Sequence, residues 1–341
     1  MRAAVTRRRW EIGVEAVEAP RAHDGDALIE VSAVGICGTD LHIWDGHRAD
    51  IEFPVRQGHE IGGTVLELPQ DYVGPLEPGD VVAVDPAMPC GQCRPCSRGR
   101  WASCAQFRAI GVALPGGLAD LVAVPTGQLH ATPGLSAAEA ALVEPLSIAA
   151  MAMHRSELIG GERLLVAGAG PIGLALTVFA VRLGMAVMVT DPVARRRELA
   201  RDLGADRVFD PTVASQEEAV AEWTAGEGVD VALEASGTEA GLRGCLQSLG
   251  RGGRLVIVGV AVHDLVVPVP RVLFDGISVV GARAGRFPEA VAVATEERLS
   301  VRRLVTHTFS LDRVDEAFTF AHEHADDAVK VLVTCGSGGW R

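Results

Sequence analysis

The chain has 341 residues, which at about 150 residues per domain predicts two domains with sizeable cores. A hydrophobic content of 48% with 22% charged residues is typical of a globular protein, and the net charge of −13 weighs against nucleic-acid or anionic-membrane partners, which select basic surfaces. The only lysine is Lys330, and no Gly-Lys-Ser/Thr phosphate loop occurs, so lysine chemistry and kinase or ATPase activity are disfavoured.

The N-terminal residues 1–10 are charged and lack the apolar core of a signal peptide. We therefore expect a cytoplasmic protein.

Residues 37–42, Cys-Gly-Thr-Asp-Leu-His, are followed by Gly58, His59 and Glu60. A thiolate, imidazoles and carboxylates close together suit zinc better than magnesium or calcium, which prefer oxygen ligands alone. Cys37 and His59 are the first two predicted ligands, and a third is expected at Glu60 or further along the chain. Gly58 permits the backbone bend that lets neighbouring side chains reach one metal. The alternative is a buried free cysteine and a core histidine, the commoner role of either residue alone.

Up to about residue 145, short apolar runs alternate with Gly, Pro and Asp turns. This pattern predicts a partly open β-barrel rather than a layered α/β domain. The expected strands are 27–34, 61–68, 81–84 and 121–124.

Four cysteines with x2, x2 and x7 spacing lie in one Gly/Pro-rich loop: Cys90, Cys93, Cys96 and Cys104. In a chain without a secretion signal, this spacing indicates a closed tetrathiolate zinc site rather than disulfides. Such a site leaves no position for a substrate, so its expected role is structural. Unrelated buried thiols are the alternative. We call residues 88–106 the cysteine lobe.

From about residue 160, apolar strands alternate with helices that end at glycines, which predicts a parallel sheet covered on both faces. The expected strands are 163–167, 186–190, 229–234 and 254–258, and the expected helices are 171–183 and 238–249, the last closed by Gly250.

The junction between the first strand and helix of this region has the dinucleotide-binding pattern GxGxxG. The residues concerned are Gly168, Gly170, Pro171, Ile172 and Gly173. The next strand ends in Asp191, which can accept a hydrogen bond from a ribose hydroxyl. The alternative is a tight strand–helix turn without a ligand. We also expect Val258 and Gly259 to contact the cofactor.

Cofactor choice depends on Asp191 and on the arginine run 195–197. Asp191 favours the 2′-hydroxyl of NAD and repels the 2′-phosphate of NADP. Since consecutive helical residues point about 100° apart, we expect Arg196 alone to turn toward the adenosine and the other two arginines to face solvent. The sequence therefore predicts NAD.

In their order along the chain, these motifs resemble zinc-dependent medium-chain alcohol dehydrogenases. The resemblance covers nearly the whole chain and is greatest to the sorbitol and threonine dehydrogenase branch, which also has a Glu-Pro-Leu run such as residues 144–146. It departs from the family pattern at Pro69, where a small residue is expected. It implies a GroES-like catalytic domain at 1–147, a Rossmann NAD-binding domain at 148–282, and a return to the catalytic domain at 283–341.

The resemblance also implies residue roles. The zinc ligands are expected to be Cys37, His59, Glu60 and Glu144. Because three anionic ligands leave a zinc at about −1, we expect Glu60 and Glu144 to share the fourth position with water or substrate. A proton relay through Thr39, the cofactor ribose and His42 is implied, with Asp40 orienting His59. The alternatives are helix capping for Thr39 or Asp40 and a surface position for His42.

The sequence therefore predicts a zinc- and NAD-dependent dehydrogenase for a secondary alcohol, most similar to those for polyols or sugars. A threonine-type dehydrogenase is one alternative, and a nucleotide-binding protein that has lost its activity is another. Two zinc ions per chain are expected. The apolar run 277–281 at the edge of the parallel sheet is expected to pair in a homodimer or homotetramer.

Overall fold

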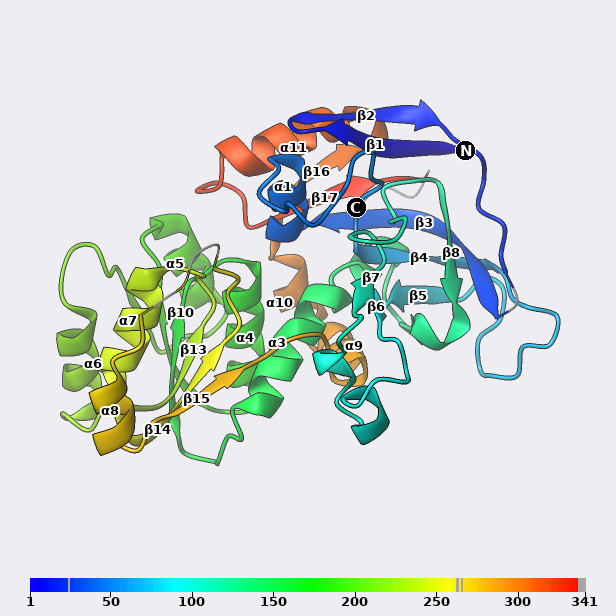
Figure 1. Ribbon diagram of the computed structural model, residues 1–341. Coiled ribbons are helices and arrows are strands. Elements are labelled where there is room, and N and C mark those ends of the chain that lie inside the picture. The colour runs from blue at the N-terminus through cyan, green and yellow to red at the C-terminus, as the bar shows by residue number, and fades with distance from the viewer. Residues whose placement is uncertain (24, 262–263, 265, 337–341) are drawn as a thin grey trace. The chain divides into compact units, whose positions relative to one another are not determined.

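The computed structural model describes residues 1–23, 25–261, 264 and 266–336 (Figure 1). The chain divides into two compact units, Met1–Glu144 with Phe287–Arg341, and Pro145–Arg286. The first unit therefore contains both ends of the chain, and the second is a continuous insertion. From the sequence, the first unit was expected to end at residue 147 and to resume at residue 283, and in the structure it ends at Glu144 and resumes at Phe287.

The first unit is built on a seven-stranded sheet in the order β16-β17-β3-β4-β5-β9, with β8 pairing on β3. Its pairings are antiparallel except that of β16 with β17. The strands are β3 (Asp26–Ile36), β4 (Glu60–Glu67), β5 (Val81–Val84), β8 (Leu121–Pro125), β9 (Leu129–Ala131), β16 (Val305–Ser310) and β17 (Lys330–Thr334). Strand β17 is thereby brought beside β3 although the two are nearly 300 residues apart in sequence.

Smaller elements complete this unit. They are the hairpin β1 (Arg2–Arg8) and β2 (Glu11–Ala16), the pair β6 (Ala87–Met88) and β7 (Arg108–Ala109), the helices α1 (Gly38–Trp44), α2 (Ala137–Ala140), α9 (Phe287–Glu296), α10 (Arg298–Arg302) and α11 (Val314–Glu323), and the 3-10 turns η1 (Cys96–Arg98), η2 (Trp101–Ser103), η3 (Thr126–Gln128) and η4 (Leu311–Arg313). Helix α3 (Val143–Arg155) crosses the division between the units.

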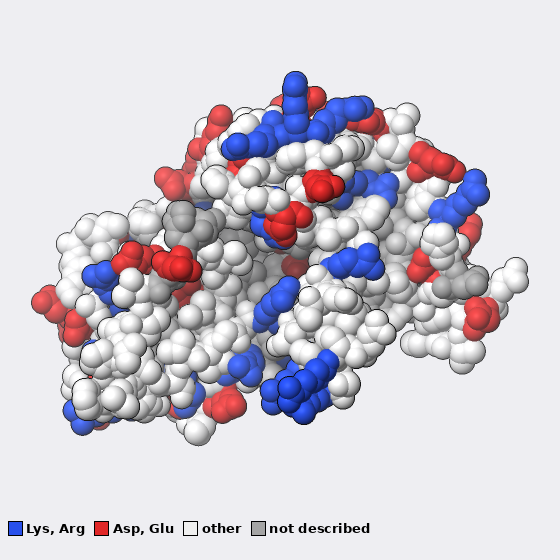
Figure 2. Space-filling model, in the orientation of Figure 1, with Lys and Arg blue, Asp and Glu red and all other residues white. Residues whose placement is uncertain are grey.

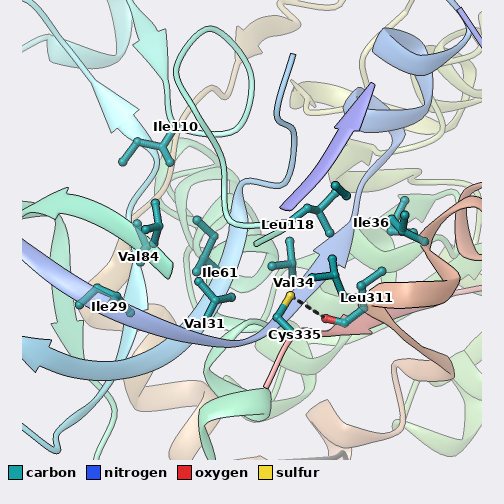
Figure 3. Packing of buried hydrophobic residues seen from close by; sticks show 14 of the residues in the cluster. Ile29, Val31, Val34, Ile36, Ile61, Val84, Ile110, Leu118, Leu311 and Cys335 are labelled. Atoms are coloured by element: carbon teal, nitrogen blue, oxygen red, sulfur yellow. Dashed lines mark hydrogen bonds between the residues drawn. The ribbon is translucent and has the colours of Figure 1, made fainter. Parts of the chain in front are cut away.

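Strand β3 runs through the core of this unit. Its first half alternates buried and partly exposed residues, and its second half is almost continuously buried, because both faces of the sheet are covered there. Figure 3 shows Val31 and Val34 of β3 within a cluster that also contains Ile61 of β4 and Leu118. This packing fixes the C-terminal end of β3, from which the chain continues into Cys37 and α1.

The second unit is a six-stranded parallel sheet in the order β12-β11-β10-β13-β14-β15. Its strands are β10 (Arg163–Ala167), β11 (Ala186–Thr190), β12 (Arg207–Phe209), β13 (Val229–Glu234), β14 (Leu249–Ile257) and β15 (Ser278–Gly281), and its helices besides α3 are α4 (Pro171–Arg182), α5 (Ala194–Asp202), α6 (Gln216–Thr224), α7 (Glu239–Ser248) and α8 (Val269–Phe274). The predicted fold class, a β-rich GroES-like domain with an inserted Rossmann domain, is confirmed.

Several expected bounds agree with the structure to the residue, including those of β5, β10, β11 and β13. One expected helix end is wrong, since Gly250 does not close α7. Leu249 caps that helix in an extended conformation and already pairs with Val229 as the first residue of β14. Burial of the Leu249 side chain at 3% exposure favours this direct passage from helix to strand.

Charged groups of both signs occur over each unit on the face shown in Figure 2, and neither sign covers that face. Among the residues that the structure describes, no helix is both long and apolar enough to cross a membrane.

Candidate active site and zinc sites

Cys37 lies at the N-cap of α1, directly after β3. Asp40, the third residue of the helix, closes the cap, because its Oδ2 accepts a hydrogen bond of 3.0 Å from the Cys37 backbone N–H. A second amide, that of Gly58, donates to Oδ1 of Asp40 at 3.3 Å. Capping was the alternative role weighed for Asp40 in the sequence. The structure shows that Asp40 does cap α1. Through its hydrogen bonds to the Cys37 and Gly58 amides it also links the segments that carry Cys37 and His59.

His59 and Glu60 follow Gly58 at the start of β4. Gly58 has a φ of +96°, and an added Cβ would lie 2.8 Å from the side chains of Leu118 and Val34, so only glycine fits this bend. The position of the Glu60 side chain depends in the same way on Gly35 of β3, because an added Cβ on Gly35 would lie 1.8 Å from Oε2 of Glu60. Gly58 and Gly35 leave the space in which the side chains of His59 and Glu60 lie.

One ligand atom each of Cys37, His59 and Glu60 lies within 4.8 Å of the other two, and we call these residues the mixed group. His59 and Glu60 are 7% and 1% exposed. Nδ1 of His59 is buried without a hydrogen-bond partner and lies 3.5 Å from Oδ2 of Asp40. This arrangement fits zinc, because Asp40 can orient the ring while the other ring nitrogen is left for the metal.

The charges in this region also suit a cation. Burial lowers the pKa of His59, but the Asp40 carboxylate and then the Cys37 thiol raise it well above its ordinary value. A positive charge on the imidazole is thus favoured here. A zinc ion held by Cys37, His59 and Glu60 would supply that charge.

Lys330 is a site residue that sequence reasoning missed. It begins β17, is 2% exposed, and its Nζ lies 2.6 and 2.7 Å from the two carboxylate oxygens of Glu60 and 3.1 Å from the Ile36 carbonyl oxygen. Burial lowers the pKa of Lys330, but the charges of Glu60 and Cys37 more than offset this and leave it raised. The only lysine of the chain, inside an apolar strand, was the available signal.

Glu144 is buried at 8% exposure but does not belong to the mixed group at its 4.8 Å spacing. Burial raises its pKa to about 7, with His59 lowering it and Glu60 raising it. The charge count made from the sequence omitted Lys330. With that lysine included, a zinc bound by Cys37, Glu60 and Glu144 is neutral rather than at about −1, so charge alone does not prevent both glutamates from binding.

Thr39 and His42 are three residues apart on α1, a spacing that places their side chains on the same helix face. Thr39 is half-buried, and the His42 side chain is 36% exposed. The pair therefore extends from the neighbourhood of Cys37 toward solvent.

The cysteine lobe brings its four thiols together, each with Sγ within 4.8 Å of the others. Sγ of Cys93 lies 3.4 Å from Sγ of Cys96 and 3.9 Å from Sγ of Cys104. The amides of Cys96 and Ala105 lower the pKa of Cys93 to about 6, and the amides of Cys90 and Gln106 donate to Cys104 at 3.2 and 3.3 Å. Backbone donors aimed at thiolates are what a tetrathiolate zinc site needs.

The glycine-rich junction of the second unit is sterically specific. Gly168 has a φ of +95°, and an added Cβ would lie 2.9 Å from the Ser236 amide nitrogen, whereas one on Gly173 would lie 1.7 Å from the Gly168 carbonyl oxygen. At Gly170 an added Cβ would meet nothing within 4 Å. Gly170 is the N-cap residue of α4, and Pro171 is the first helical residue. The exposed amides of this helix end suit an anionic pyrophosphate.

Asp191 follows β11 and is 4% exposed. Its carboxylate accepts hydrogen bonds from the amides of Ala169 at 2.7 Å and Val193 at 2.8 Å, so it is tied to the glycine-rich junction. Nη1 of Arg196 lies 3.8 Å from Oδ2 of Asp191. The expectation that Arg197 faces solvent is wrong. Its side chain is 18% exposed and lies 3.0 Å from Asp210, and it donates to the Asp191 carbonyl at 2.7 Å.

Val258 and Gly259 lie at the same edge of the sheet, where β13 and β14 end. Both amides donate at 2.9 Å to the carbonyl oxygen of Glu234. The Glu234 side chain is fully buried and accepts hydrogen bonds from the amides of Ser236 at 2.8 Å and Gly237 at 3.0 Å. An added Cβ on Gly259 would lie 2.7 Å from that carboxylate. Glu234, which the sequence reading did not single out, thus fixes the backbone beside the predicted cofactor site.

Comparisons with known proteins match both units. Residues 23–134 match the model for the alcohol dehydrogenase GroES-like domain, and residues 171–297 match the model for zinc-binding dehydrogenases. A sorbitol dehydrogenase from Bacillus subtilis is 31% identical, with 98% of this chain and 97% of the relative covered. An L-threonine 3-dehydrogenase from Alteromonas mediterranea is 32% identical, with 92% and 95% covered.

Among solved structures, a zinc-binding dehydrogenase from Sinorhizobium meliloti 1021 with NADP bound superposes with a TM-score of 0.91. It is 30% identical, and 98% of each chain is covered. The order of the cysteine, histidine and glycine-rich motifs, the two-unit fold and these full-length similarities agree, and the chain belongs to the family of zinc-dependent medium-chain alcohol dehydrogenases.

Proposed function

We propose that the protein is an NAD-dependent dehydrogenase that interconverts a secondary alcohol and its ketone, with a polyol or sugar-like compound as substrate. The observation that carries this proposal is the mixed group. A thiolate, an imidazole and a carboxylate converge in a buried space, with Asp40 beside the imidazole and Lys330 beside the carboxylate. Three ligands and one open position are typical of a catalytic zinc, whereas a closed set is typical of a structural one.

A zinc held by Cys37, His59 and Glu60 would supply Lewis acidity to the oxygen of the substrate, and a nicotinamide would supply the hydride acceptor. The protein's own residues position these groups. Cys37 and His59 are fixed through Asp40, and Lys330 holds both oxygens of Glu60. The amides at the start of α4 and the Asp191 carboxylate are the proposed cofactor contacts.

The proton lost by the alcohol needs a route to solvent. Thr39 is the proposed first acceptor, since its hydroxyl can accept and donate a proton, and His42 is the proposed last one, because its ring is partly exposed. Their shared face on α1 supports this direction of transfer.

Two substrate classes have a specific basis. The sorbitol dehydrogenase relative supports a polyol, and the threonine dehydrogenase relative supports an amino alcohol as the second candidate. The test is a panel of polyols, sugar acids, inositols and amino alcohols with NAD, followed by the absorbance of the reduced nicotinamide. We expect the highest kcat/KM with a polyol or sugar-like compound. Activity with threonine alone would replace this proposal by the second candidate.

Cofactor preference is tested in the same assay. The Asp191 carboxylate is expected to repel the 2′-phosphate of NADP more strongly than Arg196, whose Nη1 lies 3.8 Å from that carboxylate, attracts it. We therefore expect at least about a tenfold preference for NAD in kcat/KM, equivalent to ~1.4 kcal/mol, and its erosion in Asp191→Ser. Equal rates with the two cofactors would contradict this expectation. So would a preference for NADP, the cofactor bound in the Sinorhizobium meliloti structure.

We further propose a cytoplasmic homodimer or homotetramer. All seven cysteines are free, which suits a reducing compartment. Strand β15 is the last strand at one edge of the parallel sheet, and its Val279 is 41% exposed, so this edge is available for pairing with a second copy. Light scattering at micromolar concentration tests the assembly, and a monomer there would contradict it.

A further inference from the structure

A third group of metal-ligating side chains lies at the C-terminal end of α1, outside the mixed group and the cysteine lobe. It consists of His42, Asp45 and His47, with one ligand atom of each within 4.8 Å of the others. Nδ1 of His47 lies 2.7 Å from Oδ2 of Asp45, and Nδ1 of His42 lies 3.7 Å from the same oxygen. The proposed reaction uses His42 but assigns no role to Asp45 or His47.

The backbone holds these three residues in place. Asp45 caps α1, its N–H donating at 2.8 Å to the Leu41 carbonyl oxygen. Its Oδ1 accepts the His47 amide at 2.9 Å, and the Arg48 amide returns to the His42 carbonyl oxygen at 3.0 Å. The short turn from 42 to 48 is therefore preformed, which lowers the entropic cost of binding a ligand there.

Two features distinguish this turn from an ordinary hydrogen-bonded cluster. Nδ1 of His42 is buried and has no hydrogen-bond partner, and its 3.7 Å distance to Asp45 is too long for a hydrogen bond. Two donors on one tetrahedral zinc lie ~3.3 Å apart, given bonds of about 2.0–2.1 Å. The spacing of the His42 and Asp45 atoms is thus close to that of two ligands of one metal.

Asp45 itself is suited to ligation. Its side chain is 6% exposed, and although burial raises its pKa, the amide and ring of His47 lower it below its ordinary value. A carboxylate that stays ionised while buried is a strong partner for a cation. His47, by contrast, is 62% exposed and lies at the surface end of the group, so an ion can exchange with solvent.

We propose that His42, Asp45 and His47 form a third metal site, for zinc or a similar borderline divalent cation, which binds more weakly than the two zinc sites and exchanges with solvent. Two imidazoles and one carboxylate are a ligand set that such ions accept. The remaining position is open to water.

This site has a consequence for catalysis that rests on the proposed relay. A metal on His42 withdraws its imidazole from proton transfer. The enzyme is therefore expected to be inhibited by micromolar free zinc while its two other zinc sites stay filled.

The binding test is a calorimetric titration of the enzyme, first shown by metal analysis to hold two zinc ions, with zinc chloride at pH 7.5. We expect a third equivalent, with a Kd at least about tenfold weaker in His47→Ala, because one of three ligands is lost. His154→Ala removes another exposed histidine and should leave the third equivalent unchanged. Absence of a third equivalent, or its persistence at full affinity in His47→Ala, would overturn the site.

The activity test uses the same variants, because His47 has no part in the proposed reaction. His47→Ala should have wild-type kcat/KM without added zinc, and the zinc concentration for half-inhibition should rise at least about tenfold, in step with the Kd. A third equivalent that binds to the wild-type enzyme without inhibiting it would overturn the link to the relay. Since binding is measured without substrate or cofactor, its result does not depend on the proposed reaction.

Discussion

The mixed group and the cysteine lobe both gather side chains proposed to bind zinc, but they do so in different surroundings. Cys37, His59 and Glu60 lie at the ends of β3 and β4, where glycines and buried polar side chains fix each atom. Three of the four cysteines of the lobe are only half-buried, and the segment that bears them contains only the short turns η1 and η2. The mixed group depends on the hydrophobic core to position its side chains. In the cysteine lobe, a bound zinc would stabilise a segment that has no hydrophobic core of its own.

The two groups of side chains differ in what holds them in place. Asp40 and Lys330 each contact a residue of the mixed group and are themselves 1% and 2% exposed. In the lobe, the support consists of backbone amides that point at sulfur atoms. Loss of zinc should therefore stop the chemistry at the first site and loosen the chain at the second.

The largest expected effect is that of Cys37→Ala. This change removes one proposed zinc ligand of the mixed group. Because a bound zinc stabilises the charge of the transition state by several kcal/mol, its loss should lower kcat/KM by at least about a thousandfold, or ~4 kcal/mol. Metal analysis should show one zinc where the unmodified protein has two, and circular dichroism should show an unchanged fold.

Cys245→Ala is the matched control, since Cys245 is buried but belongs to neither zinc group. It should keep two zinc ions and its activity. A single zinc in the unmodified protein would remove the basis of the comparison.

The next effect is on stability and concerns Lys330. In Lys330→Met the Glu60 carboxylate loses its partner in a buried site, and breaking such a pair typically costs about 3–5 kcal/mol. We expect a loss of that size in urea unfolding of the zinc-free protein. The double variant Lys330→Met with Glu60→Gln should recover most of it, because no unpaired charge remains. Equal losses in the single and double variants would show that the pair itself does not stabilise the fold.

Asp40→Asn should have a smaller effect, on metal retention. Loss of the charge beside His59 weakens the orientation and basicity of that ligand, which typically reduces metal affinity by about 10–100-fold. Competition with a chelator measures the affinity of the mixed group for zinc. Asp80→Asn is the matched control, because Asp80 also accepts a backbone amide, that of Glu77 at 2.8 Å, but is not in a zinc group. Identical zinc affinities in the two variants would exclude the role assigned to Asp40.

The sequence was sufficient for the parts of these sites that local spacing determines. The predicted ligands Cys37, His59 and Glu60 come together in the structure, as do the four cysteines of the lobe. The glycines of residues 168–173 follow a strand and open a helix as predicted. The bounds of β10, β11 and β13 were predictable because continuous apolar runs are punctuated by glycines.

What could not be predicted depends on pairing over long distances. Lys330 reaches Glu60, 270 residues away, only because β17 pairs with β3 in the register that places Val331 opposite Ile36. Nothing near Lys330 in sequence indicates that register. Likewise, the position of Arg197 depends on Asp210, which follows a strand that was not foreseen.

The smallest effect on activity is expected from Cys104→Ala. It removes one of four thiolates and should release the zinc of the cysteine lobe, while the mixed group keeps its own, so kcat/KM should change by less than about threefold, or under ~1 kcal/mol. The lobe itself should open. Its exposed arginines Arg98 and Arg100 are trypsin sites, and mass spectrometry should find cleavage after them much faster than in the unmodified protein or in Cys245→Ala. If Cys104→Ala instead lost activity as severely as Cys37→Ala, the two zinc sites would not be independent, because the lobe would then be needed to hold the ligands at the ends of β3 and β4.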